Sequence, residues 1–173
     1  PLHLLDGGRA AWEAEGRPLA GIAPERAAAQ RTPGAAAGAT RIGRDGVLAG
    51  LGAEGRVLLD LRSVEEYRGE SLGPPPDFNH GAERFGRIPG ARHLPYTDLI
   101  DATGRFRAPE EMRAAFAARG VVEGAEVVMY CRLSHRASLG WTALTEVLGV
   151  PGARVYDGSW TEWGSLVGVP VER

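Results

Sequence analysis

The sequence predicts an α/β fold in which helices cover both faces of a central, mainly parallel sheet. From about Thr40 onward, short apolar segments alternate with amphipathic ones, which is the order of strands and helices in such a fold. The segments at 57–60 and 127–130 are continuously apolar over most of their length, as expected for strands buried on both faces. A composition of 43% hydrophobic and 24% charged residues is typical of a globular protein.

The strands follow one another at intervals that leave room for helices. After the strand at 57–60, the next is expected at 91–94, behind an Ile-Pro-Gly turn. A third follows at 127–130, and a short one at 154–156. Residues 71–86 are polar and rich in proline, so we expect them to lie over the surface, near the mouth of a site.

Three helices have recognisable signals. Ser63, with Glu66 three residues later, forms a capping box that opens a short helix. Pro109 opens a second helix, and Gly120 closes it. The helix after the strand at 127–130 turns one apolar face to the sheet, because its apolar side chains recur at spacings of 4, 3 and 4. They are Ala137, Trp141, Leu144 and Leu148.

Both ends of the chain carry Asp-Gly with a tryptophan six positions after the aspartate. The motif runs from Asp6 to Trp12 and again from Asp157 to Trp163, and both copies continue into a Gly-x-Pro-apolar segment. The offset of 151 residues is about one domain length. We interpret residues 1–19 as the tail of a preceding, related domain, with chance recurrence of abundant glycine and proline as the alternative.

The segment that follows has a different composition. Residues 20–38 are rich in Ala, Gly and Pro and show no clean period, so we expect a linker. Residues 39–173 would then form the main, catalytic domain.

Composition excludes several functions. A net charge of −2 leaves no basic footprint for nucleic acid, and no apolar run approaches the roughly 20 residues that span a bilayer. All 20 Lys+Arg residues are arginine, which excludes lysine Schiff-base chemistry and a Walker-type phosphate loop and suggests a GC-rich bacterial source. The single cysteine excludes an internal disulfide and fits a reducing compartment, so we expect a cytoplasmic protein.

The single cysteine, Cys131, stands where the strand at 127–130 gives way to a turn and a helix. Parallel sheets build their sites at this edge, and the turn amides and helix N-terminus favour an anion there. Arg132, His135 and Arg136 add positive charge or hydrogen-bond donors within five residues. We therefore predict that Cys131 is a nucleophilic thiolate and not a buried structural cysteine.

Further motifs accompany this cysteine loop, residues 131–136. They are Asp60-x-Arg62, Glu66-Tyr67-x-Gly69, Ile88-Pro89-Gly90-Ala91, Pro95 and Ala153-x-x-Tyr156-Asp157-Gly158-Ser159-Trp160-x-Glu162-Trp163. Together they resemble the rhodanese family, specifically the C-terminal, catalytic domain of two-domain thiosulfate sulfurtransferases. The resemblance covers roughly 40–173 and is most specific in the closing segment.

The resemblance implies a fold, a partner domain and a mechanism. The fold is a rhodanese-like domain with a five-stranded sheet. The partner is a related N-terminal domain in cis, of which 1–19 would be the last turn. Cys131 would take sulfane sulfur from thiosulfate as a persulfide and pass it to cyanide or a thiol, without a cofactor or metal. Arg132 and Arg136 would contact the donor anion, Ser134 and His135 would assist, and the amides of the loop, including that of Leu133, would hold the persulfide.

Four residues depart from the family pattern. Arg87 replaces the usual histidine before Ile-Pro-Gly-Ala, and Ser134 replaces the usual glycine at the fourth loop position. Leu133 stands where thiosulfate enzymes of the mammalian type have lysine, and Glu66 stands where they have a cation. The preferred donor is therefore less firmly implied than sulfur transfer itself.

Three alternatives remain from the sequence. Relatives that use 3-mercaptopyruvate have an uncharged, glycine-containing loop, unlike Cys-Arg-Leu-Ser-His-Arg. Rhodanese-like phosphatases have Cys-x5-Arg, whereas Cys131 and Arg136 form Cys-x4-Arg. Docking modules of the family typically lack the cysteine.

Two further pairs are expected to be structural. We predict that Asp60 and Arg62, two residues apart at a strand end, brace the neighbouring loops. Trp160 and Trp163 are expected to be packing anchors, with Trp160 also able to wall the pocket.

Overall fold

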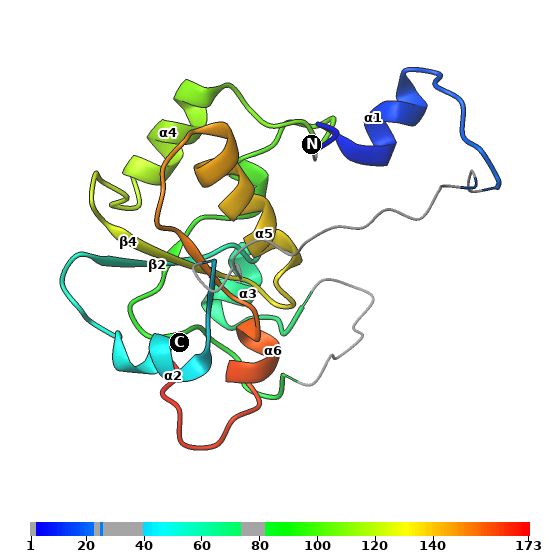
Figure 1. Ribbon diagram of the computed structural model, residues 1–173. Coiled ribbons are helices and arrows are strands. Elements are labelled where there is room, and N and C mark those ends of the chain that lie inside the picture. Colours follow the sequence, from blue (N-terminus) through cyan, green and yellow to red (C-terminus); the bar gives the residue numbers. More distant parts are fainter. Residues whose placement is uncertain (1–2, 23–24, 26–39, 74–81) are drawn as a thin grey trace.

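The protein was studied as a computed structural model that describes residues 3–22, 25, 40–73 and 82–173. A central sheet of five strands has the order β1-β5-β4-β2-β3, and every pairing between these strands is parallel (Figure 1). The strands are β1 (Arg41–Ile42), β2 (Arg56–Asp60), β3 (Arg92–His93), β4 (Glu126–Tyr130) and β5 (Arg154–Tyr156). The predicted α/β fold with a parallel sheet is confirmed.

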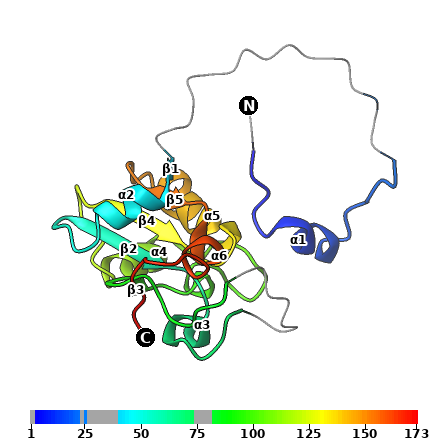
Figure 2. The same cartoon turned by 90° about the horizontal axis from the view of Figure 1, so that it is seen from below.

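Helices cover both faces of this sheet. The α-helices are α1 (Gly8–Ala14), α2 (Arg44–Ala49), α3 (Val64–Arg68), α4 (Pro109–Ala117), α5 (His135–Thr142) and α6 (Ser159–Trp163). A short 3-10 helix, η2 (Tyr96–Asp98), and a π-helical turn, η3 (Ala143–Val147), complete the helical elements. Helices α4 and α5 lie on one face of the sheet, and α2 and α6 lie on the other (Figures 1 and 2).

Alternating residues of the central strands feed two apolar cores. Leu59 and Met129 pack on the α4 and α5 side, whereas Leu58 and Val128 pack on the α2 and α6 side. All four are at most 8% exposed. This explains why the segments read as continuously apolar: both faces of each strand are covered.

Most predicted elements are present within one or two residues. Ser63 and Glu66 form the predicted capping box at α3, with each side chain bonded to the backbone of the other. The predicted helix after β4 is longer than α5 alone, because it continues through the π-turn, where the Leu148 N–H bonds to the Ala143 carbonyl. Helix α6, in contrast, was not among the predicted elements.

The described residues near the N-terminus, 3–22, contain the short helix α1, which lies to one side of the sheet (Figure 2). The residues on either side of α1 contact the loop before α4, where Asp6 accepts a hydrogen bond from the Phe106 amide at 2.9 Å and Glu15 pairs with Arg105. The predicted linker at 20–38 lies almost wholly outside the described residues, as does the 74–81 part of the predicted excursion at 71–86. In the described part of the chain, no helix combines the length and apolar character needed to cross a membrane.

Candidate active site

Cys131 directly follows β4, at the carboxyl edge of the sheet. Its side chain is 1% exposed and packs in the apolar core beneath α5, so the expectation that Cys131 is not buried is wrong, while its role as a nucleophile stays a prediction. The cysteine loop turns from β4 into α5, whose first residue is His135. The first turn of a helix leaves its amide N–H groups without intrahelical acceptors, so these groups can hold an anion near the sulfur.

The loop is held from outside by α6, which belongs to the second of the two Asp-Gly-Trp motifs. The Trp160 amide donates to the Cys131 carbonyl at 2.9 Å, and the Thr161 amide donates to the Arg132 carbonyl at 3.1 Å. The Thr161 hydroxyl donates to the same carbonyl at 2.9 Å. The Ser159 hydroxyl accepts from the Cys131 amide at 3.2 Å. Helix α6 therefore fixes the backbone on both sides of the sulfur.

Ser134 takes the backbone conformation of the glycine that it replaces. Its φ is 66°, in the left-handed region that costs a non-glycine residue about 1–2 kcal/mol. The hydroxyl donates to the Asp157 carbonyl at 2.5 Å and lies 3.3 Å from the Ser159 hydroxyl. Because the Ser134 side chain faces these supporting groups, the predicted contact of Ser134 with the donor depends on its backbone amide.

Arg136 is oriented by a buried carboxylate. Its two terminal nitrogens donate to the two oxygens of Glu66 at 2.6 and 3.0 Å, and Glu66 is only 1% exposed. Burial alone would lower the pKa of Arg136, but the paired Glu66 outweighs it, so the pKa is raised. A charge on Cys131 would act in the same direction on the pKa of Arg136.

Arg132 lies below the loop surface and is 4% exposed. A Cβ atom on Gly73 would stand 2.3 Å from its Nη1 atom, so the backbone at Gly73 lies close against this guanidinium. Burial lowers the pKa of Arg132, the charge of Glu66 opposes that shift, and Arg136 and Arg62 add to it. Guanidinium groups nevertheless remain charged at neutral pH.

The remaining two predicted residues are less enclosed. Leu133 is half-buried, and His135 is exposed on the first turn of α5. The structure thus gathers Cys131, Arg132 and Arg136, whereas His135 faces solvent. Substrate contacts by all of these residues remain predictions.

The predicted brace of Asp60 and Arg62 is confirmed, and both side chains are fully buried. Arg62 donates to the Asp60 carboxylate at 2.6 Å and to the Gly86 carbonyl at 2.8 Å. The Tyr130 hydroxyl donates to Asp60 at 2.7 Å and accepts from the Ile88 amide at 3.1 Å. This network ties β2 and β4 to the turn at 86–88, directly below the cysteine loop.

Sequence reasoning identified the tryptophans of α6 as anchors but missed the supporting role of the residues between them. Trp160 and Trp163 are both fully buried, as predicted. The contribution of Ser159 and Thr161 to the loop was not predicted. The Asp-Gly-Ser-Trp motif was the sequence signal for this role. Its contacts with residues about 30 positions away in the sequence show that it supports the cysteine loop.

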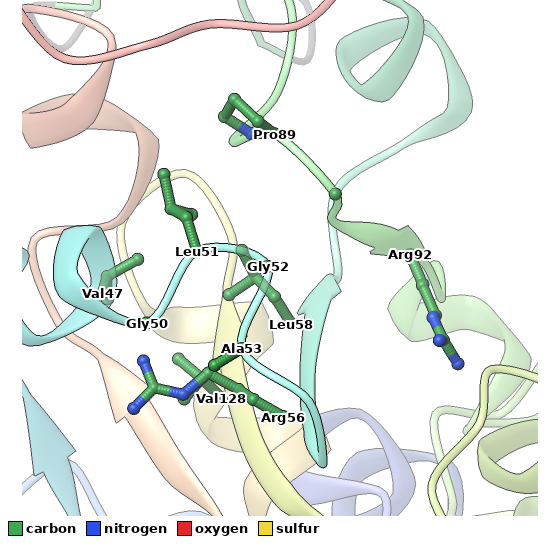
Figure 3. Close-up of a pocket in the computed structure, with 11 residues that line it drawn as sticks. Val47, Gly50, Leu51, Gly52, Ala53, Arg56, Leu58, Pro89, Arg92 and Val128 are labelled. Carbon is green, nitrogen blue, oxygen red and sulfur yellow. The ribbon is translucent and has the colours of Figure 1, made fainter.

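A separate cavity of about 230 Å³ lies away from the cysteine, beside α2 and β2 (Figure 3). Two arginines line it, and Figure 3 shows that they point in different directions. Arg56 is bonded to Glu126 at 2.7 Å, and Arg92 is bonded to the Arg119 carbonyl at 2.7 Å. Because each of these arginines is already bonded elsewhere, the cavity presents no pair of arginines to an anion, and Cys131 remains the predicted reactive residue.

The sequence is similar to known proteins over almost its whole length. The sulfur carrier protein TtuD of Thermus thermophilus is 39% identical over 175 residues. A protein of Mycobacterium bovis that is provisionally named thiosulfate sulfurtransferase 1 is 39% identical over 171 residues. Each comparison covers 99% of this chain but 61% of the relative, so the chain spans about three fifths of the length of these relatives.

Solved structures and a family model agree with the sequence relatives. The structure of EanB in complex with ergothioneine has a TM-score of 0.83 and 25% identity, over 97% of this chain and 40% of that chain. Another EanB structure, with the same values, has ergothioneine covalently linked with a persulfide cysteine. The family model described as the rhodanese-like domain matches residues 44–166. Since that model matches most of the chain, this protein belongs to the rhodanese-like domain family.

Proposed function

We propose that this protein is a sulfurtransferase that moves sulfane sulfur from thiosulfate to a thiophilic acceptor through a persulfide on Cys131. The observation that carries the proposal is the position of the single cysteine, at the carboxyl edge of β4 in a loop with Arg132 and Arg136. The names of the sulfurtransferase and sulfur carrier relatives support sulfur transfer. The persulfide cysteine in EanB supports the covalent intermediate.

The first half-reaction is an attack by the Cys131 thiolate on the outer sulfur of thiosulfate. A new sulfur–sulfur bond forms, the bond to the sulfonate sulfur breaks, and its electron pair leaves with sulfite. Arg132 and Arg136 would attract the donor and stabilise the charge on the departing sulfite. The helix N-terminus and loop amides would hold the persulfide anion.

In the second half-reaction, cyanide or a thiolate attacks the outer sulfur of the persulfide. Thiocyanate or a new persulfide leaves, and the Cys131 thiolate is restored. Because donor and acceptor react in separate steps on one covalent intermediate, ping-pong kinetics are expected.

Intact mass after incubation with thiosulfate tests the first step. Wild-type protein should gain one sulfur atom, about 32 Da, whereas the Cys131→Ser control should gain none. Cyanide or dithiothreitol should remove the added sulfur. A folded wild-type protein that gains no mass would contradict thiosulfate as the donor for this chain.

The second candidate donor is 3-mercaptopyruvate, which can be compared in the same mass experiment. A phosphatase is disfavoured because Cys131 and Arg136 enclose four residues. A docking module is disfavoured because the nucleophile and its arginines are present. Neither a phosphatase nor a docking module should release sulfite from thiosulfate, so sulfite release separates these functions from sulfur transfer.

The relatives are longer than this chain, and a second domain in cis remains a prediction. We propose that such a domain would complete the surroundings of Cys131. The same mass experiment on a longer protein that includes it would then give faster persulfide formation.

A further inference from the structure

Glu66 is a buried acid within the charged surroundings of the cysteine loop. Its carboxylate holds Arg136 through two hydrogen bonds, 2.6 and 3.0 Å long, and accepts a third from the Ser63 amide at 3.0 Å. Buried carboxylates are uncommon unless they are paired, and this one is paired with a predicted donor-binding arginine. The hydrogen bond between Glu66 and the Ser63 amide caps α3, but capping does not require Glu66 to be paired with Arg136 as well.

The charge of Glu66 extends beyond Arg136. It opposes the burial-driven lowering of the pKa of Arg132 and also favours the charged form of Arg62. Three guanidiniums and two carboxylates, linked by the Asp60–Arg62 and Glu66–Arg136 hydrogen bonds, lie at the carboxyl ends of β2 and β4, beside the cysteine loop. They are Arg62, Arg132, Arg136, Asp60 and Glu66. Their formal sum is one positive charge, and a Cys131 thiolate brings it to zero.

A donor with two negative charges must then enter surroundings that are neutral overall. Thiosulfate is such a dianion. An organic thiosulfonate carries the same reactive outer sulfur with a single negative charge, so the Glu66 carboxylate repels it less than it repels thiosulfate. This difference in repulsion is proportional to the difference in charge between the two donors.

We infer that Glu66 is a specificity-determining residue that shifts the donor preference of the site from thiosulfate toward singly charged sulfane-sulfur donors, with organic thiosulfonates as the chemical class. This inference rests on the proposed persulfide function. With methanethiosulfonate, the Cys131 thiolate attacks the outer sulfur, the bond to the sulfonyl sulfur breaks, and methanesulfinate leaves with the electron pair. The Cys131 persulfide anion is the product, as with thiosulfate.

The test compares kcat/KM for thiosulfate and for methanethiosulfonate, with cyanide as acceptor, in wild type and Glu66→Gln. Loss of the carboxylate charge should raise the ratio of thiosulfate to methanethiosulfonate about tenfold, from one charge acting on one extra donor charge. Glu65→Gln is the matched control, because Glu65 is the exposed neighbour of Glu66 and loses the same charge. Glu65→Gln should leave the ratio unchanged.

Glu66→Asp separates charge from shape. It retains the negative charge with a shorter side chain, so its donor ratio should remain close to that of wild type even if both rates fall. An unchanged ratio in a folded Glu66→Gln protein would overturn the inference, as would an equal change in Glu66→Asp. If neither donor forms a persulfide on the wild type, the proposed function fails first, and the inference falls with it.

The wild type provides a second measurement should Glu66→Gln not fold. The enzymatic ratio of methanethiosulfonate to thiosulfate is divided by the ratio of their rates with a free thiol in solution. The inference requires a quotient of at least one, because surroundings without net positive charge do not favour a dianion over a monoanion. A quotient below one would show that the site favours the dianion and would contradict the charge balance on which the role of Glu66 rests.

Discussion

The two Asp-Gly-Trp turns of this chain share a backbone design but support different things. In the first turn, residues 6–18, Gly8 has φ 57°, and in the second turn, residues 157–170, Ser159 at the matching position has φ 51°. Both conformations are left-handed, and both begin a short helix, α1 or α6. The preceding glycines differ, with φ 78° at Gly7 and −60° at Gly158, so the backbones match only from the next residue onward, and the relation of residues 1–19 to the end of the main domain stays a prediction.

The tryptophan of each turn closes it in the same way. The Trp12 indole N–H donates to the Pro18 carbonyl at 3.0 Å, and the Trp163 indole N–H donates to the Pro170 carbonyl at 2.8 Å. The aspartate, glycine, tryptophan and proline of the motif thus recur in both turns. Only the second turn contacts the cysteine loop, so the backbone conformation of the turn does not depend on a catalytic site.

The residues between those positions make the difference. In the second turn, Ser159, Trp160 and Thr161 bond to the backbone of Cys131 and Arg132. Their counterparts in the first turn are Gly8, Arg9 and Ala10. None of these three residues has a side-chain hydroxyl, so the first turn keeps the backbone conformation without the side chains that hold a cysteine loop in the second.

Replacing the closing tryptophans should give the largest difference between the turns. Trp163 is fully buried and meets the Tyr156 ring edge-on at 6.1 Å, whereas Trp12 is only half-buried. We expect Trp163→Ala to lower the free energy of unfolding by about 3–5 kcal/mol, and Trp12→Ala by about 1 kcal/mol or less. Urea denaturation measures both. Similar losses would show that the first turn is as deeply integrated as the second.

Ser134 tests how the loop and the second turn support each other. Ser134→Ala keeps the left-handed conformation and loses the bond to the Asp157 carbonyl, so we expect a loss of about 2 kcal/mol of unfolding free energy. Ser134→Gly loses the same bond but relieves the strain and should cost about 1 kcal/mol less. Urea denaturation distinguishes them. Equal losses would contradict a strained backbone at Ser134.

Ser159→Gly gives the second turn the residue of the first. Glycine adopts φ 51° without strain but loses the hydroxyl bonds to the Cys131 amide and the Tyr156 carbonyl, so the free energy of unfolding should fall by about 1 kcal/mol. The Cys131 amide loses its partner, however, and we expect kcat/KM with thiosulfate to fall about tenfold as the nucleophile is less well positioned. Gly8→Ser in the first turn is the control and should leave activity unchanged. If Ser159→Gly keeps the wild-type kcat/KM, the Ser159 hydroxyl contributes to folding and not to positioning the nucleophile.

The sequence predicted those parts of the fold that are encoded locally. Strands β2 and β4 are short apolar runs, and the α3 capping box needs only Ser63 and Glu66, so each can be recognised in a few residues. Helix α6 was missed because its five residues are too few to show a helical period, and the preceding Asp-Gly reads as a turn.

The sequence predicted the residues of the cysteine loop, but it did not predict the distant residues that hydrogen-bond to them. The cap residue Glu66 is 70 positions from Arg136, and Ser159 is 28 positions from Cys131. Neither pairing leaves a periodic signal, because both arise where the carboxyl ends of strands meet. The nucleophile could be read from a single segment, whereas its support required the three-dimensional fold.

Thr161→Val should have the smallest effect, and it measures one hydroxyl without changing side-chain shape greatly. The Thr161 amide still donates to the Arg132 carbonyl at 3.1 Å after the hydroxyl bond of 2.9 Å is lost, so the loop keeps one of two bonds. We therefore expect a loss of about 1 kcal/mol in the free energy of unfolding. Thr142→Val is the matched control, because its hydroxyl bonds to the Ser138 carbonyl within α5, where such bonds contribute little. If both variants lose the same stability, the Thr161 hydroxyl does no more than an ordinary helix threonine, and the second turn holds the loop through its backbone amides and Ser159 alone.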